Sequence, residues 1–203
     1  MYLHSKACMH RDVACRNCLI DEKQNIVKIS DFGLSKQGDS YKIPEEEKLA
    51  IRWQAPEVIE TRIYTMASDV YSFGILVWEI FNDGEIPFKG IDNKTIKSKI
   101  SDPAFRPEIA PTTPGNVKFV MKSCWDANPA TRPTMRKVFE LLLRKPTTRR
   151  QSVVTEKSKG ESRTALDCIK NVSIRAFKKR GSPSARSRRG SSLRRRKQSS
   201  KYL

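Results

Sequence analysis

The chain has 203 residues and a formal net charge of +18, from 40 Lys and Arg against 22 Asp and Glu. Residues 1–143 hold 20 basic and 19 acidic residues, whereas residues 144–203 hold 20 basic and 3 acidic residues. No apolar run is long enough to cross a bilayer, the start shows no secretory signal, and the five cysteines lack the spacing of a disulfide framework. These features exclude a membrane-spanning or disulfide-stapled protein and favour a cytoplasmic domain followed by a basic tail.

Two short motifs lie close together near the start of the chain. Residues 10–17 read His-Arg-Asp-Val-Ala-Cys-Arg-Asn, and residues 31–33 read Asp-Phe-Gly. Phosphoryl transfer between oxygens needs a carboxylate to orient or accept the proton of the attacking hydroxyl, and oxygen ligands that hold Mg²⁺ on the phosphates. Asp12 is the candidate base. Asn17 and Asp31 are the candidate ligands of Mg²⁺.

The two motifs, in this order and joined by a short apolar stretch, resemble the catalytic loop and the magnesium-binding motif of protein kinases. Ala14 stands where serine/threonine kinases usually carry Lys, and Arg16 follows it; this arrangement is similar to that of protein-tyrosine kinases. The sequence of residues 31–36 resembles that of non-receptor tyrosine kinases of the Fes/Fer type. The resemblance covers residues 1–143 and implies the mainly α-helical C-terminal lobe of the α+β protein kinase fold, with a short β-hairpin.

The resemblance also implies cofactors, a substrate and residue roles. ATP and Mg²⁺ would be the cofactors, and a protein tyrosine would be the substrate. Asp12 and Arg16, the fixed cation, would be catalytic, while Asn17 and Asp31 would hold Mg²⁺ and Leu19 would form the floor of the adenine pocket. The residues expected to act structurally are His10, Phe32, Gly33, Glu57, Asp69 and Arg132. Of these, His10 is predicted to pack beside Phe32.

The first predicted elements flank these motifs. Residues 2–3 resemble the end of the helix that precedes a kinase catalytic loop. Gln24 and Asn25, between two apolar pairs, predict a hairpin of two short strands. Cys15 and Cys18 form a lone C-x-x-C. A zinc or redox site is the disfavoured alternative there, because a second ligand pair is missing.

Residues 34–52 are polar and aperiodic, which predicts a mobile loop. By position this loop resembles the kinase activation segment, ended by Ala-Pro-Glu at residues 55–57. Tyr41, its only tyrosine, is the candidate regulatory site, and Arg11 is the candidate cation that would hold its phosphate. The acidic run at residues 45–47 could supply that negative charge instead.

The clearest predicted helix covers residues 68–82, which are apolar on most faces and therefore predict a buried core helix. Ser68 is the predicted N-cap. Asp69 either complements the helix dipole or, by resemblance, holds the backbone of the catalytic loop. Glu57 and Arg132 are expected to form an ion pair by the same resemblance.

Three further helices are expected toward the end of the domain. A short exposed helix is predicted over residues 91–100, and a second helix over residues 117–125 with Pro114 at its start. A last helix would begin at Pro133 and run through Val138 and Leu142.

Residues 144–203 are rich in Ser, Arg and Lys and are predicted to be disordered, because they cannot bury enough apolar surface. The 203 residues contain no glycine-rich phosphate loop, no Val-Ala-x-Lys strand and no partner Glu helix. We therefore expect part of a longer kinase, inactive alone. The alternatives are a catalytically inactive binding module, and a protein that binds nucleic acid or anionic lipid through its basic tail, at a membrane or in the nucleus.

Overall fold

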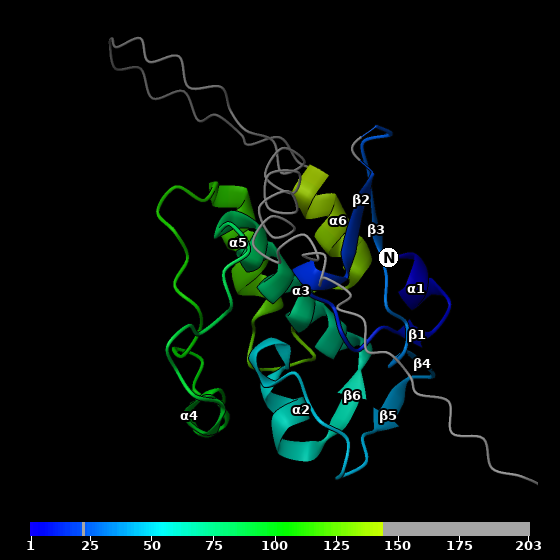
Figure 1. The fold of residues 1–203 in the computed structure, drawn as a ribbon, viewed down its shortest axis with the longest axis vertical. Coiled ribbons are helices and arrows are strands. Elements are labelled where there is room, and N and C mark those ends of the chain that lie inside the picture. Colours follow the sequence, from blue (N-terminus) through cyan, green and yellow to red (C-terminus); the bar gives the residue numbers. More distant parts are fainter. Residues whose placement is uncertain (22, 144–203) are drawn as a thin grey trace, which may run out of the picture.

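The computed structural model describes residues 1–21 and 23–143. The predicted disordered tail, residues 144–203, lies outside the described residues. The helices are α1 (Tyr2–Ser5), η1 (Cys15–Asn17), η2 (Ile51–Trp53), α2 (Pro56–Thr61), α3 (Met66–Phe81), α4 (Asn93–Lys99), α5 (Gly115–Cys124) and α6 (Met135–Leu143). The strands are β1 (Cys8–Met9), β2 (Cys18–Asp21), β3 (Ile26–Ile29), β4 (Lys36–Gln37), β5 (Ser40–Lys42) and β6 (Ile63–Thr65). α3 runs through the middle, with α5 and α6 toward one end and α2 and β6 toward the other (Figure 1).

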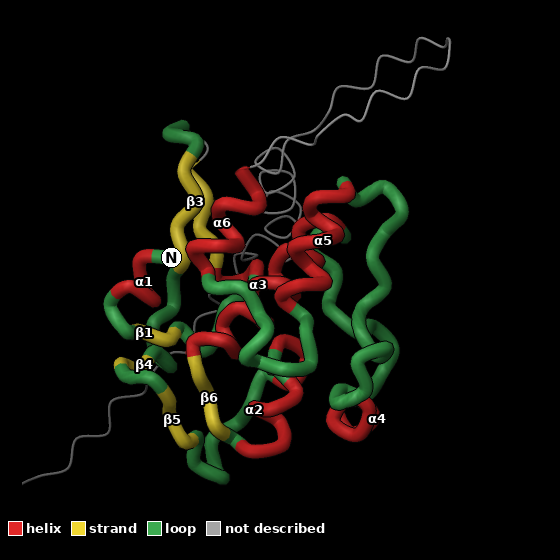
Figure 2. Tube along the Cα trace, turned by 180° about the vertical axis from the view of Figure 1, so that it is seen from behind, coloured by secondary structure: helices red, strands yellow, loops and turns green. Residues whose placement is uncertain are grey.

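The described strands form three separate two-stranded antiparallel ladders: β1 with β4, β2 with β3, and β5 with β6. The predicted hairpin is confirmed, since β2 pairs with β3 and Leu19 lies opposite Lys28. Asn25 closes the turn with a positive φ of 56°, which Asn adopts more readily than most residues. This hairpin projects at one end of the molecule, near α6 (Figure 1 and Figure 2).

α3 is the predicted core helix, and eleven of its residues are buried. The main core gathers side chains from both ends of the domain around it: Met9, Ile43, Ala55, Val58, Tyr64, Val70, Tyr71, Ile75, Val77, Trp78, Val117, Val120, Met121, Cys124, Trp125 and Val138. The indole N–H of Trp78 also donates to the carbonyl of Glu108 at 2.7 Å, which ties α3 to the segment before α5.

The start of α3 differs from the prediction. The helix begins at Met66 and its N-cap is Thr65, so Ser68 is the third helical residue. The Ser68 hydroxyl accepts the N–H of Thr65 at 3.2 Å, within a reciprocal capping box. Ser68 therefore satisfies the free N–H of the N-cap residue. It does so from the third helical position, which is the position of the partner residue in a capping box.

The later helices also differ in detail. Asp92 caps α4 by accepting the N–H groups of Lys94 and Thr95. The prediction of an exposed helix is only partly right, because Ile96 is fully buried in a second apolar cluster that also holds Phe88. The last helix begins at Met135 rather than at Pro133, a boundary shift of the size that sequence patterns leave open.

The prediction of a mobile loop over residues 34–52 is wrong where strands form. Tyr41 lies in β5 directly opposite Tyr64 of β6. Arg62 donates from its guanidinium to the carbonyls of Pro44 and Glu47. The segment is therefore held by a ladder and by side-chain hydrogen bonds to its backbone, which composition alone does not reveal.

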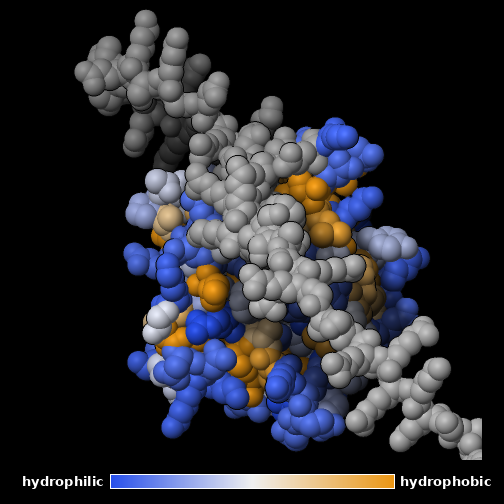
Figure 3. Space-filling view, in the orientation of Figure 1, coloured by the Kyte–Doolittle hydropathy of each residue, from blue (hydrophilic) through white to orange (hydrophobic). Residues whose placement is uncertain are grey.

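Hydrophilic residues dominate the visible surface of the described part, and apolar residues emerge between them in separate patches (Figure 3). Among the described helices, none has the length and apolar character needed to span a membrane.

Gly74 marks the closest approach between α3 and the end of α5. A Cβ atom there would lie 2.6 Å from Nε1 of Trp125 and 2.8 Å from Cβ of Cys124. Ala is favoured over Gly in a helix by about 1 kcal/mol, but overpacking a core costs about 1–3 kcal/mol. We expect Gly74→Ala to lower the melting temperature. Gly115→Ala is the control, because nothing lies within 4 Å of a Cβ at that position. An unchanged or higher melting temperature for Gly74→Ala would contradict the close packing.

Candidate active site

The catalytic loop is anchored to α3 by one buried carboxylate. Asp69 accepts the backbone N–H of His10 on Oδ2 at 2.8 Å and that of Arg11 on Oδ1 at 2.9 Å. The phenol of Tyr64 donates to Oδ1 at 2.8 Å, and Nε2 of His4 lies 3.1 Å from Oδ2. Asp69 thus makes the backbone contacts that the family resemblance implied, and it makes them from the first turn of α3.

His10 bridges the two motifs. Its buried imidazole accepts the N–H of Asp12 on Nδ1 at 3.3 Å, and Nε2 lies 3.1 Å from the carbonyl oxygen of Ser30. This pair of contacts assigns the ring proton to Nε2. The ring also meets Phe32 edge-on, with centroids 5.0 Å apart. His10 therefore packs beside Phe32 as the sequence predicted, and it aligns the loop with the Asp-Phe-Gly motif.

Two residues of the same loop contact the carboxylate of Asp12. Asn17 donates from Nδ2 to Oδ2 of Asp12 at 2.8 Å and to its main-chain oxygen at 2.7 Å. Arg16 forms an ion pair with Oδ1, and its guanidinium lies over the ring of Trp53 at 4.4 Å. The Asp12 side chain is 14% exposed. The Asp12 carboxylate is therefore held in a fixed position near the surface. A general base for a substrate hydroxyl requires such a position.

The donor chemistry fits a magnesium ion between the two motifs. The amide nitrogen of Asn17 is engaged by Asp12, so its amide oxygen is the atom suited to a cation. Asp31 is exposed and has a φ of 64°, and its Oδ1 accepts the N–H of Gly33 at 3.4 Å. Mg²⁺ typically takes one or two such protein oxygens and completes its shell with phosphates and water. Over residues 1–21 and 23–143, no group of three or more His, Cys, Asp or Glu could hold a metal alone.

Leu19 is presented as an apolar surface. It lies on β2 and is 60% exposed, and no neighbouring lobe covers it within the described residues. Such exposure of a large apolar side chain is compatible with the predicted floor of an adenine pocket.

Glu79 is a site residue that sequence reasoning missed. It lies near the end of α3, is 5% exposed and accepts the N–H of Cys15 at 2.9 Å. Burial raises the pKa of its carboxyl, and the Cys15 N–H and nearby Arg16 oppose that rise. The available signal was an acidic residue inside an otherwise apolar helix, because such residues are rarely buried unless paired.

Burial disfavours the thiolate form of the two thiols behind the catalytic loop. Burial raises the pKa of Cys18 to about 11 and that of Cys15 further. Both are free thiols, and thiolates are the form that binds metal or attacks disulfides. A zinc or redox site at the C-x-x-C pair therefore stays the disfavoured alternative.

Arg11 connects the loop to the segment that follows it. Its side chain is 2% exposed and pairs with Glu47, and it donates to the carbonyl of Leu34 at 3.0 Å. The guanidinium carbon lies 4.4 Å from the ring centroid of Tyr41, and the ammonium of Lys36 lies 5.1 Å from it. The aromatic ring of the candidate regulatory residue is thus flanked by two cations.

Glu57 and Arg132 form a bidentate ion pair, with both N–O distances at 2.7 Å. The Arg132 side chain is fully buried, and Glu57 is 20% exposed. Arg132 also donates to the carbonyls of Ala67 and Asp126, and Ser68 donates to Glu57. The pair therefore ties α2 to the start of α3 and to the loop before α6.

The family described as "Protein tyrosine and serine/threonine kinase" matches residues 1–142, and the chain belongs to this family. Fer-related kinase 1 of Caenorhabditis elegans is 40% identical over 142 residues, which are 70% of this chain and 36% of that protein. Tyrosine-protein kinase Fer of Homo sapiens is 39% identical over 152 residues, 72% of this chain and 18% of that protein. Fibroblast growth factor receptor 1 of Xenopus laevis is 42% identical over 142 residues, 68% of this chain and 17% of that protein.

The resemblance to tyrosine kinase catalytic domains of the Fer type is therefore confirmed. The chain spans 36% or less of the length of these relatives. The helices with a few short strands fit a kinase fold. The chemical roles assigned to Asp12, Arg16, Asn17 and Asp31 stay predictions.

Removing the Arg132 side chain should destabilise the domain strongly. Breaking a buried pair from one side costs about 3–5 kcal/mol, because the other charge is left without a partner. Arg136→Ala is the matched control, since Arg136 is 82% exposed and pairs with Glu140 at 3.9 Å on the surface of α6. Denaturant unfolding of both variants would measure the difference. Equal, small losses of unfolding free energy would show that the Glu57 pair contributes no more than a surface pair.

Proposed function

We propose that residues 1–143 form the C-terminal lobe of a protein-tyrosine kinase, which transfers the γ-phosphoryl group of ATP to tyrosine hydroxyls of proteins. The observation that carries this proposal is the Asp12 carboxylate, held by Asn17 and Arg16 on a loop whose backbone is fixed by Asp69. Family membership and the names of the relatives support the same reaction. Location in the cytoplasm is part of this proposal.

In this proposal Asp12 orients the substrate hydroxyl and accepts its proton. Asn17 keeps the carboxylate in place, and Arg16 presents a cation close to the same oxygens. Asn17 and Asp31 would hold Mg²⁺, which when bound neutralises charge on the phosphates. Leu19 would contact the adenine base. All of these groups position and stabilise charge, which is most of what phosphoryl transfer requires.

The choice of tyrosine as the acceptor rests on the sequence of the catalytic loop and on a rigid surface beside that loop. Arg52 donates to the carbonyls of Pro87 and Phe88 at 2.8 and 2.6 Å. The Ser72 hydroxyl donates to the carbonyl of Trp53 at 2.8 Å. η2 is thereby fixed to α3 and to a neighbouring turn. We propose that this surface supports the substrate, even though Ala50 stands where tyrosine kinases usually have Pro.

The 203 residues alone should not transfer phosphate at a useful rate, because the lysine and glycine-rich loop that would fix the phosphates are missing from them. The test compares this chain with a longer chain that carries both parts, each assayed with ATP, Mg²⁺ and a tyrosine-rich polypeptide. We expect activity only in the longer chain. Asp12→Asn should lower it by about 10²–10⁴-fold, the usual contribution of a general base.

Asp102→Asn is the control, since Asp102 is exposed and its side chain accepts the N–H of Ala104 within its own turn. An inactive longer chain, or activity that survives Asp12→Asn, would contradict the proposed reaction. Robust transfer by the 203-residue chain would contradict the need for the missing parts.

Tyr41 should act as a phosphorylation switch in the active, longer chain. A phosphate there would add nearly two negative charges between the cations of Arg11 and Lys36, which already flank the ring. Tyr41→Phe should abolish the rise in activity that follows preincubation with ATP. Glu47→Gln tests the alternative, in which the acidic run at residues 45–47 supplies the negative charge, because Glu47 pairs with Arg11 in the present structure. If only Glu47→Gln lowers activity, the acidic run orders the segment and Tyr41 does not.

Binding of nucleic acid or anionic lipid was predicted for the basic tail, which lies outside the described residues. That alternative stays a prediction, and the described part of the chain offers no observation that favours it over catalysis.

A further inference from the structure

α3 meets the catalytic loop at a second point, ten residues after Asp69. The carboxylate of Glu79 accepts the backbone N–H of Cys15 on Oε2 at 2.9 Å. Cys15 is the first residue of η1, and Ala14, the N-cap of η1, makes no side-chain hydrogen bond to the turn. The first N–H groups of a helical segment have no partners inside that segment. Glu79 therefore caps η1 from a distant helix, in the way that a local Ser or Asp ordinarily does.

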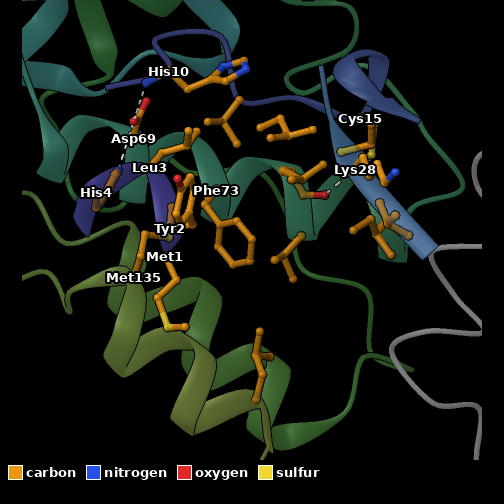
Figure 4. Close-up of a pocket in the computed structure, with 18 of the residues that line it drawn as sticks. Met1, Tyr2, Leu3, His4, His10, Cys15, Lys28, Asp69, Phe73 and Met135 are labelled. Atoms are coloured by element: carbon orange, nitrogen blue, oxygen red, sulfur yellow. Dashed lines mark hydrogen bonds and ion pairs between the residues drawn. The ribbon is translucent and has the colours of Figure 1, made fainter. Parts of the chain in front are cut away.

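The catalytic loop is attached to α3 at both of its ends. At the first end, Asp69 accepts the N–H groups of His10 and Arg11. At the second end, the thiol of Cys15 adds to the backbone contact, because Sγ lies 3.8 Å from the carbonyl oxygen of Leu76. Figure 4 shows Asp69 beside His10 at one end of this stretch and Cys15 at the other.

The chain between the two attachment points has little slack. Ten helical residues rise about 15 Å along the axis of α3, whereas the five steps from residue 10 to residue 15 can span at most about 18 Å. Ala14 is accordingly extended, with φ of −161° and ψ of 160°. Asp12 lies inside this stretch, so the position of its carboxylate depends on both attachments.

η1 also carries both side chains that hold the Asp12 carboxylate. Asn17 donates to Oδ2 at 2.8 Å, and Arg16 pairs with Oδ1. A rotation of this short turn would move both partners of Asp12 together. The contact at Cys15 opposes such a rotation, because it fixes the first N–H of the turn against α3.

Glu79 is enclosed by groups of the same site. Burial raises the pKa of its carboxyl, and the Cys15 N–H, the Trp53 side chain and nearby Arg16 oppose that rise. Within the described residues the indole nitrogen of Trp53 is buried without a hydrogen-bond partner of ordinary geometry, so it acts on Glu79 at longer range. The Arg16 guanidinium lies over the Trp53 ring at 4.4 Å. The carboxylate therefore lies where α3, η1 and η2 meet, rather than on the free surface of α3.

We propose that Glu79 is a positioning residue for phosphoryl transfer, which sets the orientation of η1 by holding the N–H of Cys15. Through Arg16 and Asn17, η1 in turn sets the position of the Asp12 carboxylate. The role rests on the proposed function. A displacement of about 1 Å at the reacting groups can lower a rate about 10²-fold, so a single hydrogen bond away from the chemistry is enough to change catalysis.

Three substitutions separate the hydrogen bond from the charge and the volume of Glu79. Glu79→Gln removes the charge but keeps an oxygen that can accept the Cys15 N–H. Glu79→Met has a similar volume and no such acceptor. Glu79→Asp keeps the charge, but its shorter side chain withdraws the acceptor from the loop.

The contact itself is tested in the 203-residue chain, by hydrogen exchange of single amides followed by NMR, which needs no activity. In Glu79→Met and Glu79→Asp, the amide of Cys15 should exchange about tenfold faster, because it loses local protection. In Glu79→Gln it should exchange as in the unmodified chain. The amide of Thr95, bonded to Asp92 at 2.9 Å on α4, should stay unchanged and shows that each variant is folded. Unchanged exchange at Cys15 in all three variants would overturn the proposal, whatever the activity.

The catalytic effect is tested in the longer chain that carries the glycine-rich loop and the lysine. Glu79→Met and Glu79→Asp should lower kcat about 10²-fold and leave KM for ATP and for the polypeptide unchanged, because Glu79 acts only through the loop. Glu79→Gln should keep most of kcat. Val120→Ala, a substitution in the buried core on α5, is the control for lost stability, since it should lower the melting temperature without lowering kcat.

The outcomes distinguish this role from the proposed function. Unchanged kcat in Glu79→Met, or an equal loss in Glu79→Met and Glu79→Gln, would overturn the positioning role and leave the proposed function in place. A longer chain that transfers no phosphate before any substitution would overturn both.

Discussion

The carboxylate of Asp69 determines the geometry on which the candidate active site depends. It is 1% exposed and accepts the N–H groups of two consecutive loop residues, His10 and Arg11. Arg11 has a φ of 70°, in a region that costs a residue with a side chain about 1–2 kcal/mol. Charge-assisted hydrogen bonds to a buried carboxylate are strong enough to offset that cost. The loop can therefore turn sharply and present Asp12 at the edge of solvent.

A set of arginines extends this control from α3 to the rest of the domain. Arg132 joins Glu57 and two backbone carbonyls, Arg62 binds carbonyls of the segment after β5, and Arg52 binds the turn after Pro87. Each guanidinium offers up to five donors in a fixed plane, so one side chain satisfies several carbonyls that would otherwise lack partners. The irregular segments around the site are consequently held without long strands or helices.

Particular residues show how far sequence reasoning extends. The contacts of Asp69 and the Glu57–Arg132 pair follow from motif resemblance, because the family uses these residue types at fixed places. Glu79 did not follow, since nothing in its local sequence indicates that Cys15, far away along the chain, would place an N–H against it. The N-cap of α3 was misplaced for a related reason. Thr65 and Ser68 can each cap a helix, and only the backbone conformation selects between them.

The sequence by itself determined the core helix and the β2–β3 hairpin, because apolar periodicity and turn residues are local properties. The class of protein followed from the resemblance of its two motifs to those of the kinase family. Tertiary structure alone decided that residues 40–42 form a strand against β6 rather than a mobile loop. It also decided that Arg11 pairs with Glu47 and lies over Tyr41. These features arise where segments distant in sequence meet, and the free energy of such contacts depends on burial and geometry that no single segment contains.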